Sequence, residues 1–176
     1  MLYHSTRSVS PCVDSAQAVL EGLAPDGGLY MPQKLPEFDW QACLQGTSQE
    51  MATAILSALL PDIPNMRQLV SNAYTGKFET EDLTPTVPVG DFHVLELFRG
   101  PTSAFKDVAL SMLPQLLTAA KQEKGQDKDI LILTATSGDT GKAALEGFHD
   151  VPGIRICVFY PHVGVSQVQR AQMVTQ

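Results

Sequence analysis

The feature that most constrains the fold of this chain is a pair of short apolar runs separated by one helical pattern. The runs cover residues 130–133 and 154–160 and have the composition of buried strands. A turn at residues 137–141 follows the first run at once, and residues 142–148 then read as a helix. Strand, helix and strand in this order predict a βαβ unit with parallel strands, and therefore an α/β protein.

The turn after the first apolar run has the composition of an anion-binding site. In open α/β sheets, ligands bind beyond the carboxyl ends of the strands, which is where this turn lies. Hydroxyls and backbone N–H groups at a helix N-terminus can bind a carboxylate or a phosphate. The same composition is also typical of a well-capped helix, so spacing leaves both interpretations open. The residues concerned are Ser137, Gly138, Asp139 and Thr140.

A second segment places one lysine at the start of a predicted helix. Apolar spacing predicts this helix from about Ser103 to Lys124, after a Gly-Pro turn, and Pro114 predicts a kink or a break within it. Lys106 would lie in the first turn, where unpaired N–H groups form a positive end. That field and partial burial beside Phe105 favour the uncharged amine, which is the form that attacks an aldehyde. The alternative is a lysine that extends from an amphipathic helix into solvent.

The first half of the chain is predicted to be helical. Thr47 and Glu50 have the spacing of a capping box, and residues 64–76 continue with a second helical pattern. Residues 83–90 contain two prolines and a glycine and are interpreted as a linker. We therefore expect a helix-rich N-terminal domain over residues 1–88 and an α/β domain over residues 89–176.

Composition limits the partners of the chain. A net charge of −7 makes nucleic acids and anionic membranes poor partners. No apolar stretch approaches the ~20 residues of a membrane helix, and no signal peptide is recognisable. Three distant cysteines without a Cys-x-x-Cys motif favour reduced thiols and a cytoplasmic protein. The four histidines have no ligand spacing, so no metal site is predicted.

Four segments, in order along the chain, resemble those of one family. Residues 97–107, LFRGPTSAFKD, are similar to the lysine segment of threonine synthases, which are pyridoxal-phosphate enzymes of fold type II. Residues 134–141 resemble that family's loop after the second motif strand, where related enzymes often carry asparagine in place of Asp139. The remaining matches are the N-terminal signature at residues 5–7 and 22–32, and a later segment with Tyr160, Pro161, Ser166, Gln169, Gln172 and Met173.

The resemblance implies a fold, a reaction and a site. The fold is a helix-rich N-terminal domain followed by the first half of a doubly wound parallel-sheet domain that binds pyridoxal phosphate. The reaction converts O-phospho-L-homoserine and water to L-threonine and phosphate, with Lys106 bound covalently to the cofactor. Cofactor contacts are implied for Lys106, Phe105 and Asp139, and contacts with the substrate carboxylate for Ser137, Gly138 and Thr140.

Other interpretations and one expectation accompany this resemblance. A phospholyase that releases 2-oxobutyrate, a serine/threonine dehydratase and a non-catalytic binding module could share the same motifs. Family members are much longer and hold the cofactor phosphate with a glycine-rich loop further along the chain. We therefore expect this chain to be an inactive N-terminal fragment, with an incomplete sheet through which it self-associates.

Overall fold

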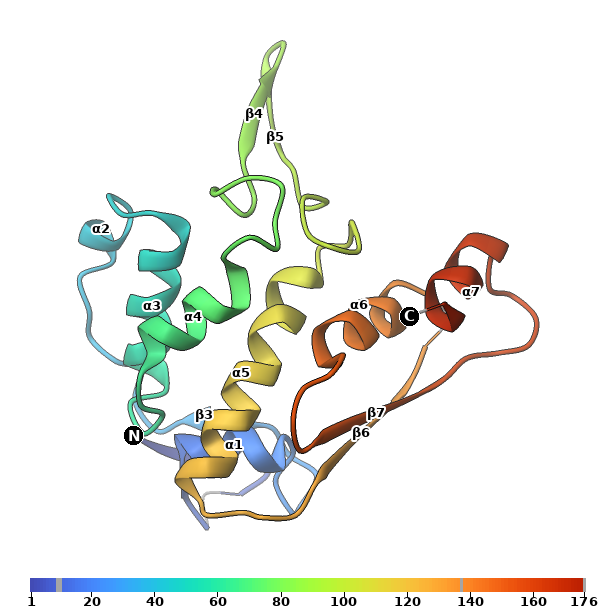
Figure 1. Ribbon diagram of the computed structural model, residues 1–176. Helices are drawn as coiled ribbons and strands as arrows, with labels where there is room; N and C mark the ends of the chain where they lie inside the picture. Colours follow the sequence, from blue (N-terminus) through green and yellow to red (C-terminus); the bar gives the residue numbers. More distant parts are fainter. Residues whose placement is uncertain (9–10, 137, 176) are drawn as a thin grey trace. The chain divides into compact units, whose positions relative to one another are not determined.

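The structure, a computed structural model, describes residues 1–8, 11–136 and 138–175 and divides into two compact units (Figure 1). The first unit comprises Met1–Asn72 with Gln115–Asp127, and the second comprises Ala73–Pro114 with Lys128–Gln176. The predicted α/β class is confirmed, because helices alternate with small sheets along the chain. The domain boundary expected after residue 88 stays a prediction.

The first unit combines a small antiparallel sheet with several helices. The strand order in the sheet is β2–β1–β3. The predicted capping box is confirmed at the start of the third helix, where Thr47 and Glu50 each bind the backbone N–H of the other. The elements are β1 (Leu2–Ser5), β2 (Val13–Asp14), α1 (Ser15–Glu21), β3 (Tyr30–Pro32), α2 (Trp40–Cys43), α3 (Ser48–Leu59) and most of α4 (Met66–Tyr74).

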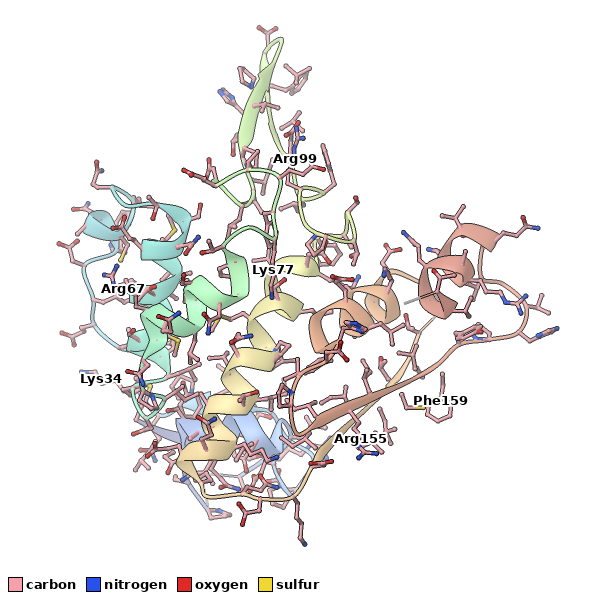
Figure 2. The ribbon with its side chains drawn as sticks, viewed as in Figure 1. Lys34, Arg67, Lys77, Arg99, Arg155 and Phe159 are labelled. Atoms are coloured by element: carbon pink, nitrogen blue, oxygen red, sulfur yellow. The ribbon has the colours of Figure 1, made fainter. Side chains whose placement is uncertain are left out.

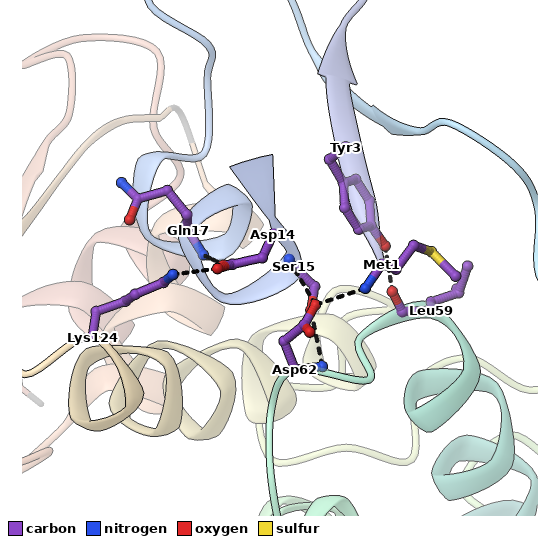
Figure 3. Close-up of polar contacts among 8 residues, drawn as sticks. All are labelled: Met1, Tyr3, Asp14, Ser15, Gln17, Leu59, Asp62 and Lys124. Carbon is purple, nitrogen blue, oxygen red and sulfur yellow. Dashed lines mark hydrogen bonds and ion pairs between the residues drawn. The ribbon is translucent and has the colours of Figure 1, made fainter. Parts of the chain in front are cut away.

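Two carboxylates tie the elements of the first unit together (Figure 3). Asp62 accepts hydrogen bonds from the backbone N–H and hydroxyl of Ser15, at 3.2 and 2.7 Å, and lies 3.0 Å from the Met1 ammonium. The Ser15 hydroxyl is the main cause that holds the pKa of Asp62 below its ordinary value. Asp14 caps α1 and forms an ion pair with Lys124. These contacts join residues distant in sequence within one unit.

The second unit contains the predicted parallel strands. Strands β6 and β7 pair in parallel, with Ile130 opposite Ile154 and Ala135 opposite Phe159, which confirms the βαβ order of strand, helix and strand. Helix α6 connects them and contacts both β7 and α7. The elements are β4 (Thr86–Val89), β5 (Phe92–Leu95), the first half of α5 (Asp107–Glu123), β6 (Ile130–Ala135), α6 (Asp139–Phe148), β7 (Ile154–Phe159) and α7 (Gln167–Val174).

The prediction of a linker over residues 83–90 is wrong for its second half, because residues 86–89 form strand β4. Strand β4 pairs antiparallel with β5, and Pro88 lies opposite His93 within this hairpin. A two-stranded hairpin tolerates proline, because both of its strands are edge strands. The turn is formed by Gly90, whose φ is +61°, and Asp91. The proline that favoured a linker is therefore compatible with a strand here.

One face of the β6–β7 sheet is covered and the other is bare. The side chains that alternate toward α6, such as Ile130 and Ile154, are half-buried or buried. On the other face Leu131, Leu133 and Phe159 are 58%, 62% and 60% exposed. Arg155 and Phe159 project from the same strand of this face (Figure 2). Parallel sheets are ordinarily covered on both faces, so this apolar surface lacks its usual partner within the residues described.

Pro114 lies inside α5 and does not break it, so of the kink or break predicted there the break is wrong and the kink stays a prediction. The helix runs through it from Asp107 to Glu123. Proline has no N–H, so the usual bond to the carbonyl of Leu110 cannot form. Gly147 of α6 packs against that same carbonyl, since a Cβ at Gly147 would lie 2.2 Å from the Leu110 oxygen. The close helix contact therefore depends on glycine at this position.

Two further observations concern the helices and the cysteines. Within residues 1–8, 11–136 and 138–175, no helix combines the length and apolar character that crossing a membrane requires. Among the described residues, Cys12, Cys43 and Cys157 form no disulfide.

Candidate functional site

Lys106 lies immediately before helix α5 and not within its first turn. The helix begins at Asp107, and the Lys106 carbonyl accepts a hydrogen bond from the N–H of Leu110 at 2.9 Å. The start predicted near Ser103 is wrong, because Ser103 adopts a left-handed conformation, with φ of +57°, which a right-handed helix cannot contain. Lys106 therefore occupies the N-cap position, at the positive end of the helix.

Asp107 shapes the loop that leads to Lys106. Its carboxylate accepts hydrogen bonds from the backbone N–H and hydroxyl of Thr102, at 2.8 and 2.5 Å, and from the N–H of Ala104 at 3.3 Å. The residue is only 2% exposed. A Cβ at Gly100 would lie 2.5 Å from this carboxylate, so the loop closes only around glycine. Sequence reasoning overlooked Asp107, although an acidic residue in the first turn of a helix is a recognisable signal.

The Lys106 ammonium lies over the Phe105 ring, 4.2 Å from its centroid. Lys106 is half-buried, whereas Phe105 is largely exposed. The neighbouring carboxylate of Asp107 accepts hydrogen bonds from the loop instead. In the described part of the chain no carboxylate forms an ion pair with Lys106. The amine is therefore held by a weak cation–π contact that a ligand can displace.

Tyr74 supports the first turn of α5 from α4. Its hydroxyl donates a hydrogen bond to the carbonyl of Val108 at 2.9 Å. Burial raises the pKa of Tyr74 to about 12, so the hydroxyl keeps the proton that it donates. The ring also makes an edge-to-face contact with Phe78, with centroids 5.8 Å apart. Helix α5 is thereby anchored two residues after Lys106.

The loop from Gly100 to Lys106, here called the lysine loop, is fixed at its other end by Arg99, which follows the β4–β5 hairpin in the sequence (Figure 2). Its guanidinium lies 2.7 Å from the Glu79 carboxylate and 2.6 Å from that of Glu96. These carboxylates, Glu79 first, raise the pKa of Arg99. The Arg99 carbonyl also accepts a hydrogen bond from the N–H of Glu79 at 2.9 Å. The loop from Gly100 to Lys106 is therefore anchored at both ends.

The predicted anion-binding turn follows β6 and opens α6. Gly138 is the N-cap of α6, and no side chain caps this helix among the described residues. The N–H of Gly138 donates to the Thr136 hydroxyl at 3.2 Å. The N–H groups of Asp139 and Thr140 belong to the first turn, where a helix offers no carbonyl partner. They are suited to an anion, whereas Ser137 lies outside the described residues.

Gly141 allows the first turn of α6 to lie directly on the end of the sheet. A Cβ at this position would come within 2.3 Å of the Thr136 side chain and 3.0 Å of Val158. It would also lie 3.2 Å from the sulfur of Met173 in α7. Strand, turn and helix therefore meet at a point where only glycine fits.

Both predicted segments belong to the second unit. Lys106 precedes α5, and Gly138, Asp139 and Thr140 open α6. In the described part of this unit, no hydrogen bond or ion pair joins Lys106 to the α6 turn. The turn instead contacts α7, because Asp139 accepts a hydrogen bond from the Gln169 side chain at 3.1 Å. Sequence reasoning did not find this contact, which links residues 30 positions apart.

The chain is similar in sequence to threonine synthases. The family model described as the N terminus of threonine synthase matches residues 2–74. The threonine synthase of Methylobacillus glycogenes is 38% identical over 98% of the chain, and that of Saccharomyces cerevisiae is 37% identical over 99%. The chain spans 39% and 38% of the lengths of these two relatives.

A solved structure agrees with these sequence matches. The crystal structure of threonine synthase from Brucella melitensis with bound PLP has a TM-score of 0.87 to this chain and 38% sequence identity. The match covers 98% of this chain and 38% of that one. In both sequence and fold, nearly all of this chain matches threonine synthases. The matched part is less than half of the length of each of these relatives.

Proposed function

Because this chain corresponds in sequence and in fold to the N-terminal portion of threonine synthases, we propose that it forms part of an enzyme that makes L-threonine. The proposed reaction converts O-phospho-L-homoserine and water to L-threonine and phosphate, with pyridoxal phosphate as cofactor. The observation that carries the proposal is the Lys106 amine, which stands at the N-terminus of α5 without a carboxylate partner in the described residues. The chain alone, at about two fifths of the relatives' length, is proposed to be inactive.

The residues present fit the cofactor. Lys106 supplies a primary amine on a loop anchored at both ends, and this amine would bind the aldehyde carbon of pyridoxal phosphate. Phe105 would lie against the bound cofactor, because its ring already contacts the Lys106 amine. When bound, pyridoxal phosphate supplies an electron-poor ring that stabilises negative charge on the substrate carbons. Lys106, once released by substrate, would move protons at the substrate's Cα and at the cofactor's C4′.

The α6 turn would bind the substrate carboxylate and one cofactor oxygen. Ser137, Gly138 and Thr140 would donate hydrogen bonds to the carboxylate, because a helix N-terminus favours an anion. Asp139 would lie near the 3′-oxygen of the cofactor. An ionised carboxylate can only accept a hydrogen bond, so a bond between these two oxygens would need a proton on one of them.

Product analysis tests the proposed reaction. The natural protein that carries this chain, supplied with pyridoxal phosphate and O-phospho-L-homoserine, is expected to release L-threonine and phosphate in equal amounts. Release of 2-oxobutyrate would instead identify a related phospholyase, and 2-oxobutyrate formed from threonine would identify a dehydratase. Absence of any cofactor-dependent product would favour a non-catalytic binding module.

We also propose that residues 1–176, expressed alone, self-associate through the bare face of the β6–β7 sheet and its open edge. Leu131, Leu133 and Phe159 form an apolar surface that a second copy can cover. Light scattering is expected to give a mass above that of one chain, with Leu133→Lys reducing it. Phe92→Lys is the control, since this residue is 75% exposed on the hairpin. A single-chain mass at high concentration, or loss of association only with Phe92→Lys, would contradict the proposal.

The proposed location is the cytoplasm, and the proposed partner is the small-molecule substrate. Cys12, Cys43 and Cys157 form no disulfide in the described part of the chain, which is compatible with a reducing compartment. The acidic net charge of −7 opposes binding to nucleic acid or to an anionic membrane surface.

A further inference from the structure

The side chain of Gln169 is held at one end by the cap of α7. Gln169 is the third residue of this helix, and its backbone N–H donates to the Ser166 hydroxyl at 3.2 Å. In return the Ser166 N–H and hydroxyl donate to Oε1 of Gln169, at 3.4 and 3.1 Å. A backbone N–H can only donate, so the amide atom that faces it must be the oxygen. The capping box therefore determines the orientation of the Gln169 amide.

The other end of the Gln169 amide reaches the first residue of α6. Its Nε2 donates to Oδ1 of Asp139 at 3.1 Å. An amide NH₂ can only donate, so Oδ1 must be the accepting oxygen of that carboxylate. The other oxygen, Oδ2, is not part of this bond.

The amide also lies directly against the α6 turn. A Cβ at Gly138 would come within 2.4 Å of the Gln169 Nε2 and 2.9 Å of its Cδ. A long side chain could ordinarily move away at little cost, but this one is held by Ser166 at one end and by Asp139 at the other. Gly138 therefore leaves the space in which the amide bridges the two helices.

We propose that Gln169 is a positioning residue that holds Oδ1 of Asp139 and so directs Oδ2 toward the 3′-oxygen of the cofactor. This inference rests on the proposed function. In this arrangement Oδ1 makes the contact that the oxygen of an amide would make, and Oδ2 takes the place of the amide NH₂. An asparagine at position 139 could make the same two contacts, with its oxygen toward Gln169 and its NH₂ toward the cofactor.

The test compares variants of the natural, cofactor-loaded protein by cofactor affinity and by the position of the visible absorption band. Gln169→Glu removes the NH₂ donor and turns a carboxylate toward Asp139. This variant is expected to bind the cofactor about tenfold more weakly, or worse, and to shift the visible absorption band. Thr175→Ala removes a side-chain hydrogen bond at the other end of α7 and leaves Ser166, Gln169 and Asp139 in place, and it is expected to change neither. Asp139→Asn is expected to retain the band, since both contacts are preserved.

Two results would overturn the inference. One is a Gln169→Glu protein with unchanged affinity and an unchanged band. The other is an equal loss in the Thr175→Ala protein, because the effect would then come from the stability of α7. Thermal unfolding of each variant without cofactor shows whether a loss of affinity comes from reduced stability of the protein or from loss of the Gln169 contact. Failure of the unmodified protein to bind the cofactor would count against the proposed function, independently of Gln169.

Discussion

Replacement of Lys106 by alanine is expected to abolish the visible absorption band of bound pyridoxal phosphate in the natural protein. It is also expected to lower turnover by about 10²- to 10⁴-fold, because alanine can neither bind the aldehyde carbon nor transfer a proton. Absorption spectra and steady-state rates measure the two effects. Both should be large, since no other residue named in the proposed site carries an amine on its side chain.

Lys142 provides the matched control for that experiment. Lys142 belongs to the same unit and lies in the first half of α6, and its ammonium is 3.7 Å from the carboxylate of Glu146. Lys142→Ala is expected to retain the band and most of the turnover. A Lys106→Ala protein that retained both band and rate would refute the assignment of the cofactor lysine.

The second large effect is expected for Asp107→Ala, which removes the acceptor around which the lysine loop is folded. The N–H groups of Thr102 and Ala104 and the Thr102 hydroxyl would lose their partner in a buried setting. The expected loss is about 2–4 kcal/mol in the free energy of unfolding. Chemical denaturation of the natural protein measures this loss. Cofactor capture should also slow, since Lys106 adjoins the altered residue.

Asp129→Ala is the control for the loss of a carboxylate. Asp129 forms an exposed ion pair with Arg155 at 3.4 Å, and such pairs contribute only about 0–1 kcal/mol. The loss in free energy of unfolding for Asp107→Asn should lie between those for Asp129→Ala and Asp107→Ala. Asparagine keeps one accepting oxygen but turns an NH₂ group toward N–H donors. An Asp107→Ala protein no less stable than Asp129→Ala would show that the loop does not depend on this carboxylate.

Local patterns in the sequence were sufficient to predict the central elements of the fold. The apolar runs predicted the parallel strands β6 and β7, because buried parallel strands are continuously apolar. The spacing of Thr47 and Glu50 predicted a capping box, because both of its hydrogen bonds lie within four consecutive residues. Patterns confined to one element are readable from sequence in this way.

Contacts between distant segments could not be predicted in the same way. The Gln169–Asp139 hydrogen bond depends on how α7 packs beside α6, which no local spacing encodes. Helix α5 begins later than its apolar periodicity suggested, because Asp107 draws the preceding residues into a loop around Gly100. The hairpin at β4 was overlooked because Pro88 is unfavourable in a sheet interior, although it is tolerated on an edge strand.

The most direct test of the central claim is borohydride reduction of the natural protein loaded with pyridoxal phosphate, followed by peptide mapping. The account predicts that the reduced cofactor is attached to Lys106, in the peptide that contains Phe105 and Asp107. Attachment to a different lysine, or no attachment to any peptide although the cofactor is bound, would contradict it.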